Sequence, residues 1–154
     1  MRRLLPLALI RRSSIRWTPT LAAVVALVPL AGAGVWTVDD DGGPGVDFTD
    51  IQPAVLAAAP GDTILVAPGT YGMQCDIRVG KPLRIVGTGA QPGDVHLSCL
   101  NPSVRIEGVG GSQPVVLSNL GGSGTVEVRD CQAPVLLVDI GLALEGSKGR
   151  DVRV

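Results

Sequence analysis

Short apolar triplets that recur about every 20 residues constrain the fold of this chain more than any other feature. A first set of apolar–any–apolar triplets consists of Ile64–Val66, Leu83–Ile85, Val104–Ile106, Val126–Val128 and Val152–Val154. A second set, offset by about half a period, repeats with the same period as Val95–Leu97, Val115–Leu117 and Val135–Leu137. Strands this short do not form independent sheets, so they must stack on one another.

Stacked short strands at this period predict an all-β fold, a parallel β-solenoid whose successive coils pair about 4.8 Å apart. The chain has 154 residues, which is room for one such domain. Its 21 glycines and 12 prolines disfavour long helices. We expect about 4–5 coils between residues 49 and 154, the last of them incomplete at the C-terminal side.

Alternation within the first set of triplets predicts which side chains face the core. The flanking apolar residues would point inward, and the middle residues Arg84, Arg105, Glu127 and Arg153 would form one outward column. This column is our candidate face for an anionic glycan or another ligand; a plain solvated face is the alternative. In the second set, either Val135 and Leu137 or Leu136 and Val138 form the inward pair.

A short helix is expected before the first coil. Thr49 and Gln52 have the spacing of a capping box, with Thr49 as the N-cap and Phe48 as a hydrophobic staple. Ile51, Val55 and Ala58 would then lie on one buried face, and the sequence Pro60-Gly61-Asp62 would end the helix. A helix of about nine residues needs packing for stability, so we expect it to cover the open end of the first coil.

The N-terminal region has the pattern of an export signal. Five arginines precede an uncharged apolar stretch, and Ala31-Gly32-Ala33 offers the small residues that a signal peptidase accepts, so we predict cleavage after Ala33. Residues 1–33 would be the signal peptide and residues 34–48 an acidic, glycine-rich lead-in; an uncleaved anchor is the alternative. The mature chain would carry 8 basic and 14 acidic residues, which disfavours nucleic acid as a partner. We expect a secreted or cell-surface protein without a membrane span after cleavage.

Three segments carry a resemblance to a known family. Residues 47–52, 57–71 and 81–87 resemble the opening of secreted right-handed parallel β-helix proteins of the pectin-lyase-like superfamily, and the likeness covers about residues 36–90. It implies a right-handed β-helix but assigns no activity, because lyases, hydrolases and surface proteins share this opening. Within it, Pro68-Gly69 suits a type II turn with a positive φ at Gly69, and Tyr71 would pack beside that turn.

Catalytic chemistry of that superfamily uses clustered carboxylates, and no such cluster is evident in the coils. Asp130, Asp139 and Asp151 are separated by strands, and we interpret His96 as an outward strand residue. We therefore assign no catalytic residue and no cofactor. The run Asp39, Asp40 and Asp41 is a candidate site for Ca²⁺; a solvated acidic turn is the alternative.

The three cysteines form an odd set. Export favours one disulfide, for which we choose Cys75 and Cys99, with Cys131 left over. Three small buried side chains are the alternative.

The function we predict is that of an exported, noncatalytic β-helix scaffold or surface protein that binds a polysaccharide or a surface protein. The alternative is the N-terminal fragment of a polysaccharide lyase or glycoside hydrolase. The strand at Val152–Val154 lacks a following cap, so we also expect self-association through the last coil.

Overall fold

The computed structural model describes residues 32–72, 76–98, 104–149 and 152–154. Residues 1–31 of the predicted signal peptide, Asp151, and the predicted disulfide partners Cys75 and Cys99 lie outside the described residues. Ala31–Val154 forms one compact unit. Within the described residues, no helix has the length and apolar character needed to cross a membrane.

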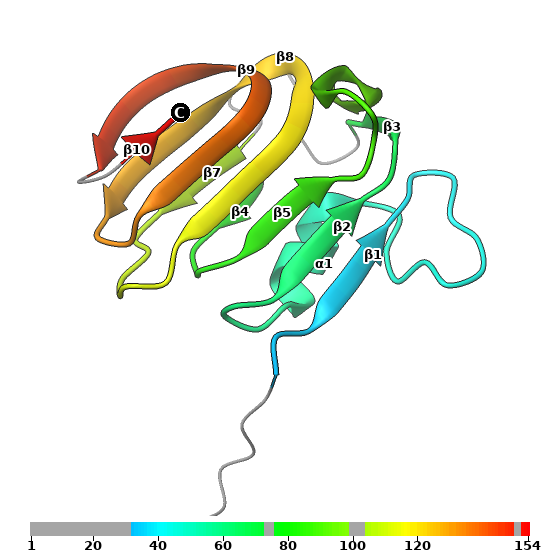
Figure 1. Cartoon of the computed structure of the whole chain (residues 1–154), viewed down its shortest axis with the longest axis horizontal. Coiled ribbons are helices and arrows are strands. Elements are labelled where there is room, and N and C mark those ends of the chain that lie inside the picture. The colour runs from blue at the N-terminus through cyan, green and yellow to red at the C-terminus, as the bar shows by residue number, and fades with distance from the viewer. Residues whose placement is uncertain (1–31, 73–75, 99–103, 150–151) are drawn as a thin grey trace, which may run out of the picture. The chain divides into compact units, whose positions relative to one another are not determined.

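Ten strands of the described residues join one sheet, and every strand pair is parallel. In chain order the elements are β1 (Val35–Val38), α1 (Ile51–Ala57), β2 (Thr63–Val66), β3 (Gly69–Tyr71), β4 (Ile77–Val79), β5 (Arg84–Gly87), a short 3₁₀ helix (Pro92–Asp94), β6 (Val95–Leu97), β7 (Val104–Glu107), β8 (Val115–Cys131), β9 (Val135–Gly149) and β10 (Val152–Arg153). The sheet curls into a half-barrel (Figure 1).

The strands pair in three rows. The first row runs β1, β2, β5, β8, β9 and β10; the second runs β3, β6, β8 and β9; the third runs β4, β7, β8 and β9. The long strands β8 and β9 take part in all three rows because they bend between them. Asn119 and Asp139 lie at equivalent positions of the first bend, with φ of 55° and 50°. Asparagine and aspartate adopt this left-handed conformation more readily than other side chains, which explains their place at a corner.

The core lies inside the curl and follows the predicted alternation. Leu83, Ile85, Val104, Ile106, Val126 and Val128 are all buried, which confirms the predicted inward direction in these three triplets. For the last triplet the prediction was wrong at its final residue, because Val154 is 87% exposed. In β9, Val135 and Leu137 are buried while Val138 is 46% exposed, so the first of the two alternatives for this strand is confirmed.

The alignment of the triplets into two columns was wrong. Residues 64–66 and 84–87 belong to the first row, whereas 104–106 and 126–128 belong to the third. Likewise residues 95–97 lie in the second row, but 115–117 and 135–137 lie in the first. The physical reason is that connections between strands differ in length, so that Val86 pairs with Ser118, well beyond one expected period. A regular spacing of triplets therefore does not identify residues of the same row.

Helix α1 differs from the prediction at its start. Asp50 is the N-cap, and its Oδ1 accepts a hydrogen bond from the Ile51 amide at 2.7 Å. The predicted capping box is wrong, because Gln52 Oε1 instead accepts from the Arg78 amide of β4 at 2.7 Å. The predicted buried face, which includes Ile51 and Val55, is confirmed. The helix packs against β1, β2 and β4 and lies within the curl at the β1 end (Figure 1).

Two further expectations concern the turn before β3. Gly69 does not have a positive φ, so the type II turn was wrong there. Glycine at this position instead leaves room for the carboxylate of Asp40, which a Cβ would displace. The Tyr71 hydroxyl donates to the Ala67 carbonyl at 2.8 Å, which confirms that this side chain packs beside the turn.

The sheet also begins earlier than residue 49. Strand β1 lies in the segment that we predicted as a lead-in, and it pairs with β2 from Val35 to Val38.

Candidate functional site

A row of charged side chains crosses the outer face of the third row of strands. Arg78 of β4 is in register with Arg105 of β7, which is in register with Glu127 of β8. Each points away from the core because the residues on both sides of it are buried. We call Asp76, Arg78, Arg105, Glu127 and Arg129 the charged row.

Basic and acidic side chains of this row pair with one another in alternation across the strands. Asp76 Oδ2 accepts from Arg78 Nε at 2.6 Å, and Asp76 Oδ1 lies 3.5 Å from Arg105 Nη1. Arg105 Nε donates to Glu127 Oε2 at 3.3 Å, and Arg129 Nε donates to Glu127 Oε1 at 2.6 Å. Asp76 thus bridges two arginines that would otherwise repel each other on neighbouring strands. The hydrogen bond and charge of Asp76 also raise the pKa of Arg78.

The two ends of the charged row remain open to a ligand. The side chain of Arg78 is 58% exposed and that of Arg129 is 55% exposed, whereas that of Arg105 is only 19% exposed. A guanidinium carries five N–H donors in a planar fork, so each outer arginine keeps donors that its own ion pair does not use. Such donors suit carboxylate or sulfate groups.

The structure brings together only two of the four residues in the predicted ligand column. Arg105 and Glu127 are neighbours in the third row, but Arg84 and Arg153 lie in the first row. Arg84 has Thr63 and Val116 as its register partners. Arg84 and Arg105 are therefore not neighbours across the strands.

Sequence reasoning missed Asp76, Arg78 and Arg129. A usable signal existed, because Ile77–Val79 and Val104–Ile106 are both apolar triplets with arginine in the middle. The spacing between these two triplets is longer than the expected period, so the likeness was not followed.

The acidic turn Asp39, Asp40 and Asp41 is a second candidate. One carboxylate oxygen from each residue lies within 4.8 Å of the others. Two of the groups already serve the backbone: Asp39 Oδ1 accepts from the Asp41 amide at 3.1 Å, and Asp40 Oδ2 accepts from the Thr70 amide at 2.9 Å. Three carboxylates could hold a hard cation such as Ca²⁺, although calcium sites usually supply about six to eight oxygens.

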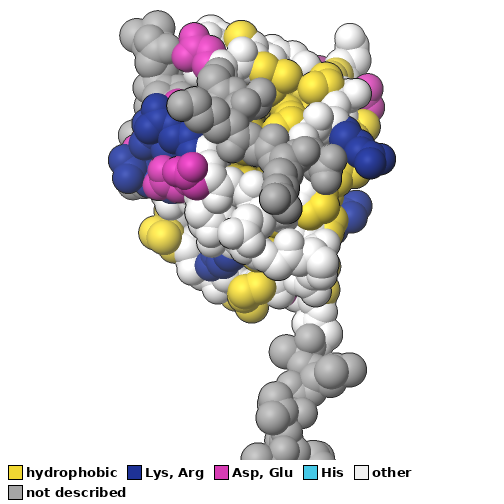
Figure 2. Space-filling model, turned by 90° about the vertical axis from the view of Figure 1, so that its left-hand side faces the viewer, with side chains coloured by type: hydrophobic (Ala, Val, Ile, Leu, Met, Phe, Trp, Pro, Cys, Tyr) yellow, Lys and Arg dark blue, Asp and Glu magenta, His cyan; other side chains and the backbone are white. Residues whose placement is uncertain are grey.

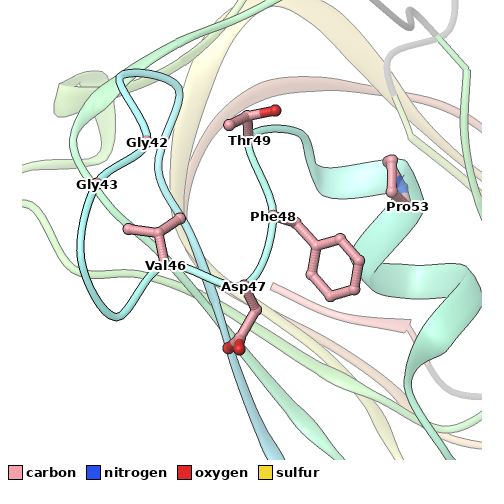
Figure 3. A pocket seen from close by; sticks show the side chains of 7 residues that line it. All are labelled: Gly42, Gly43, Val46, Asp47, Phe48, Thr49 and Pro53. Atoms are coloured by element: carbon pink, nitrogen blue, oxygen red, sulfur yellow. The ribbon is translucent and has the colours of Figure 1, made fainter.

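Two hollows flank this turn. One of about 300 Å³ is lined by residues 42–43, 46–49 and Pro53, with the Phe48 ring lying between the loop and α1 (Figure 3). The other, of about 270 Å³, is lined by Asp40, Thr49, Asp50, Thr70, Tyr71 and Gly72. Burial and the nearby Asp40 charge raise the pKa of Tyr71 to about 12, so its hydroxyl stays protonated in this setting.

The side of the molecule formed by β9 and β10 carries apolar groups. Figure 2 shows hydrophobic side chains on this face, with basic and acidic side chains gathered beside one another at one margin. Val138 and Leu144 of β9 are among the exposed apolar residues. A shallow pocket of about 290 Å³ is lined by Pro114, Pro134, Leu136 and Arg153, which places Arg153 at an apolar hollow rather than in the charged row.

Other residues discussed in the sequence analysis lie within the strands or at their bends. His96 pairs with Thr70 and Gly121 in the second row. Asp130 has a φ of 49° near the end of β8, and Asp139 lies at the bend of β9. Cys131 is free and buried, and its Sγ lies 3.2 Å from the Arg129 carbonyl oxygen.

Comparison with known proteins gives one partial likeness. A stretch of 66 residues, 43% of this chain, is 44% identical to the F-box protein SKIP5 of Arabidopsis thaliana. The matched stretch spans about a quarter (24%) of the length of that protein. No family model matches the chain. No solved structure matches it.

Proposed function

We propose that this protein is an exported, noncatalytic scaffold with a right-handed parallel β-helix fold, which binds an acidic polysaccharide along its charged row. The observation that carries the binding proposal is the pair of exposed guanidiniums, Arg78 and Arg129, at the two ends of that row. Arg78 lies on β4 and Arg129 on β8. These strands are two places apart in the third row, so the strands themselves are separated by about 10 Å.

The three rows of strands support the β-helix. One coil would consist of one strand from each row, as in β2, β3 and β4, and β8 and β9 would each be a whole coil. Counted in this way, the strands are consistent with the proposed about 4–5 coils. Crossovers between parallel strands of one sheet are right-handed in almost all proteins, which supports the hand.

An acidic polysaccharide fits the charged row better than a neutral one. Its carboxylates could accept paired hydrogen bonds from the outer guanidiniums without breaking the inner Arg105–Glu127 pair. Neutral sugars are commonly held on aromatic faces. The sequence has no tryptophan, tyrosine or phenylalanine after Tyr71.

The alternative is the N-terminal fragment of a polysaccharide lyase or glycoside hydrolase, as the family resemblance permits. The likeness to the F-box protein SKIP5 carries no activity to this chain, because it spans only 24% of that protein.

Binding is tested with polygalacturonate as the acidic probe and dextran as the neutral one, by calorimetry on the full chain as secreted. Replacing Arg78→Gln and Arg129→Gln together should weaken polygalacturonate binding by at least about tenfold, because two charge-assisted contacts are lost. The matched control, Arg84→Gln with Arg153→Gln, removes the same charge from the first row and should leave affinity nearly unchanged. Equal loss in both double variants would refute the charged row as the site.

The same mixtures test the enzyme alternative. A rise in unsaturated ends or reducing ends of the polymer over time would show lyase or hydrolase activity and overturn the noncatalytic proposal. Export is tested separately: a secreting host should release a chain that begins at Gly34, and intact Met1 on a cytoplasmic product would contradict it.

A further inference from the structure

Asp62 is a buried carboxylate with an unusual set of donors. The residue is 6% exposed, and it lies just before β2 at the end of the α1 connection. Its Oδ1 accepts from the Gly34 amide at 2.6 Å, and its Oδ2 accepts from Trp36 Nε1 at 2.9 Å and from the Ala59 amide at 2.8 Å. No ion pair within the described residues includes Asp62. Its negative charge is therefore held mainly by neutral N–H groups.

Lys81 is the charged side chain that acts on this carboxylate, from a distance. Its Nζ donates to the Leu56 carbonyl at 3.2 Å and also to the Ala58 carbonyl, so its hydrogen bonds go to the end of α1. The Gly34 nitrogen already occupies the position beside Asp62 Oδ1 that a cationic group would need in order to form a direct ion pair.

Gly34 lies directly on this carboxylate. A Cβ at position 34 would be 3.1–3.2 Å from three atoms of the Asp62 carboxyl group, so only glycine fits without displacement. The two described residues before it, Gly32 and Ala33, are exposed, and a Cβ at Gly32 would meet no atom within 4 Å. The peptide bond between Ala33 and Gly34 therefore joins an exposed segment to a nitrogen that is anchored on a buried acid.

This bond is the one that the predicted export signal assigns for cleavage. Hydrolysis breaks the bond between the Ala33 carbonyl carbon and the Gly34 nitrogen. The hydroxyl of water joins the carbonyl carbon, and the nitrogen gains one proton from water and one from the new carboxylic acid. The products are a carboxylate on Ala33 and an α-ammonium group on Gly34, which is protonated at neutral pH.

We propose that cleavage after Ala33 creates an ion pair between the new α-ammonium group of Gly34 and Asp62, so that processing itself locks the N-terminal edge of the sheet. The precursor makes only a neutral amide hydrogen bond at this position, whereas the mature chain makes a charge-assisted one, which is about twice as strong. The inference rests on the proposed export for its biological setting. The ion pair itself can be tested without export.

The test replaces the five residues before Gly34 in the full chain by the enteropeptidase recognition sequence, so that one preparation can be melted before and after the cut. Cutting should raise the melting temperature by about 3 °C or more. Asp62→Asn should abolish this rise, and the control Glu145→Gln, which neutralises an exposed carboxylate of β9, should retain it.

A chemical variant covers the case in which Asp62→Asn does not fold. Carbamylation of the freed Gly34 amine with cyanate removes the charge but leaves an N–H donor, so the carbamylated chain should melt like the uncut one. The proposal is overturned if cutting leaves the melting temperature unchanged, if the rise survives Asp62→Asn, or if the carbamylated chain melts like the cut chain. A secreted product that begins elsewhere than Gly34 would refute the export proposal alone.

Discussion

Replacing Ile106 by alanine tests whether the third row of strands holds a continuous apolar core. Ile106 is fully buried, and it lies in register between Val79 of β4 and Val128 of β8, which are buried as well. Ile→Ala in a core costs about 2–5 kcal/mol, and more when the surroundings cannot collapse. The backbone ladders on both sides hold the neighbouring strands apart, so we expect about 4 kcal/mol here.

That loss corresponds to a large change in thermal stability. In a chain of this length each 1 kcal/mol lowers the melting temperature by about 2–4 °C, so Ile106→Ala should melt about 8–16 °C below the parent. The control is Arg84→Ala, which removes an exposed side chain and should change stability by less than about 0.5 kcal/mol. Calorimetric melts of the three proteins measure both. If Arg84→Ala costs as much as Ile106→Ala, the assignment of inside and outside is wrong.

Other consequences concern single groups. Arg105→Asp would place a third carboxylate beside Asp76 and Glu127, so it should be less stable than Arg105→Gln by about 1 kcal/mol in urea unfolding; equal values would refute the network. Hydrogen bonds from Trp36, and from two backbone amides, hold the pKa of Asp62 below its ordinary value, so its stabilisation is present above about pH 4 and is lost as the pH falls through the folded pKa. Asp62→Asn should therefore flatten the acid limb of a stability–pH curve, and an unchanged limb would contradict this. Burial raises the pKa of Tyr71 to about 12, so the absorbance of this single tyrosine should titrate near 12 in the folded chain, not near its ordinary 10.

Local alternation was predictable from the sequence because it depends on neighbouring residues alone. A charged residue between two apolar ones, as in Leu83-Arg84-Ile85, fixes which side chains are buried whatever the strand pairs with. The pairing itself depends on the lengths of the connections. The segment between Gly87 and Val115 includes a 3₁₀ helix and β6 and β7, which the expected period does not accommodate.

The candidate site was predicted only in part for the same reason. The triplet spacing placed Arg105 and Glu127 together because their strands lie close to one expected period apart in the chain. These two strands are also neighbours in the third row, so the prediction holds for this pair. Arg78 was missed because more than one expected period separates its strand from β7. The cap of the helix also depends on contacts that are distant in the sequence. Gln52 could have completed a capping box, but its side-chain oxygen accepts a hydrogen bond from the Arg78 amide of β4 instead.

Cross-linking between strands tests the arrangement in three rows most directly. Two double variants are compared in a background with Cys75→Ser, Cys99→Ser and Cys131→Ala: Arg78→Cys with Arg105→Cys, and Arg84→Cys with Arg105→Cys. A disulfide requires Cα atoms about 4.4–6.8 Å apart, a range that includes neighbouring strands. Because Arg78 and Arg105 are register partners, the first pair should oxidise to an intramolecular disulfide and the second should not. Efficient cross-linking of residues 84 and 105, with none between 78 and 105, would show that the regular triplet spacing sets the coil and would contradict the charged row.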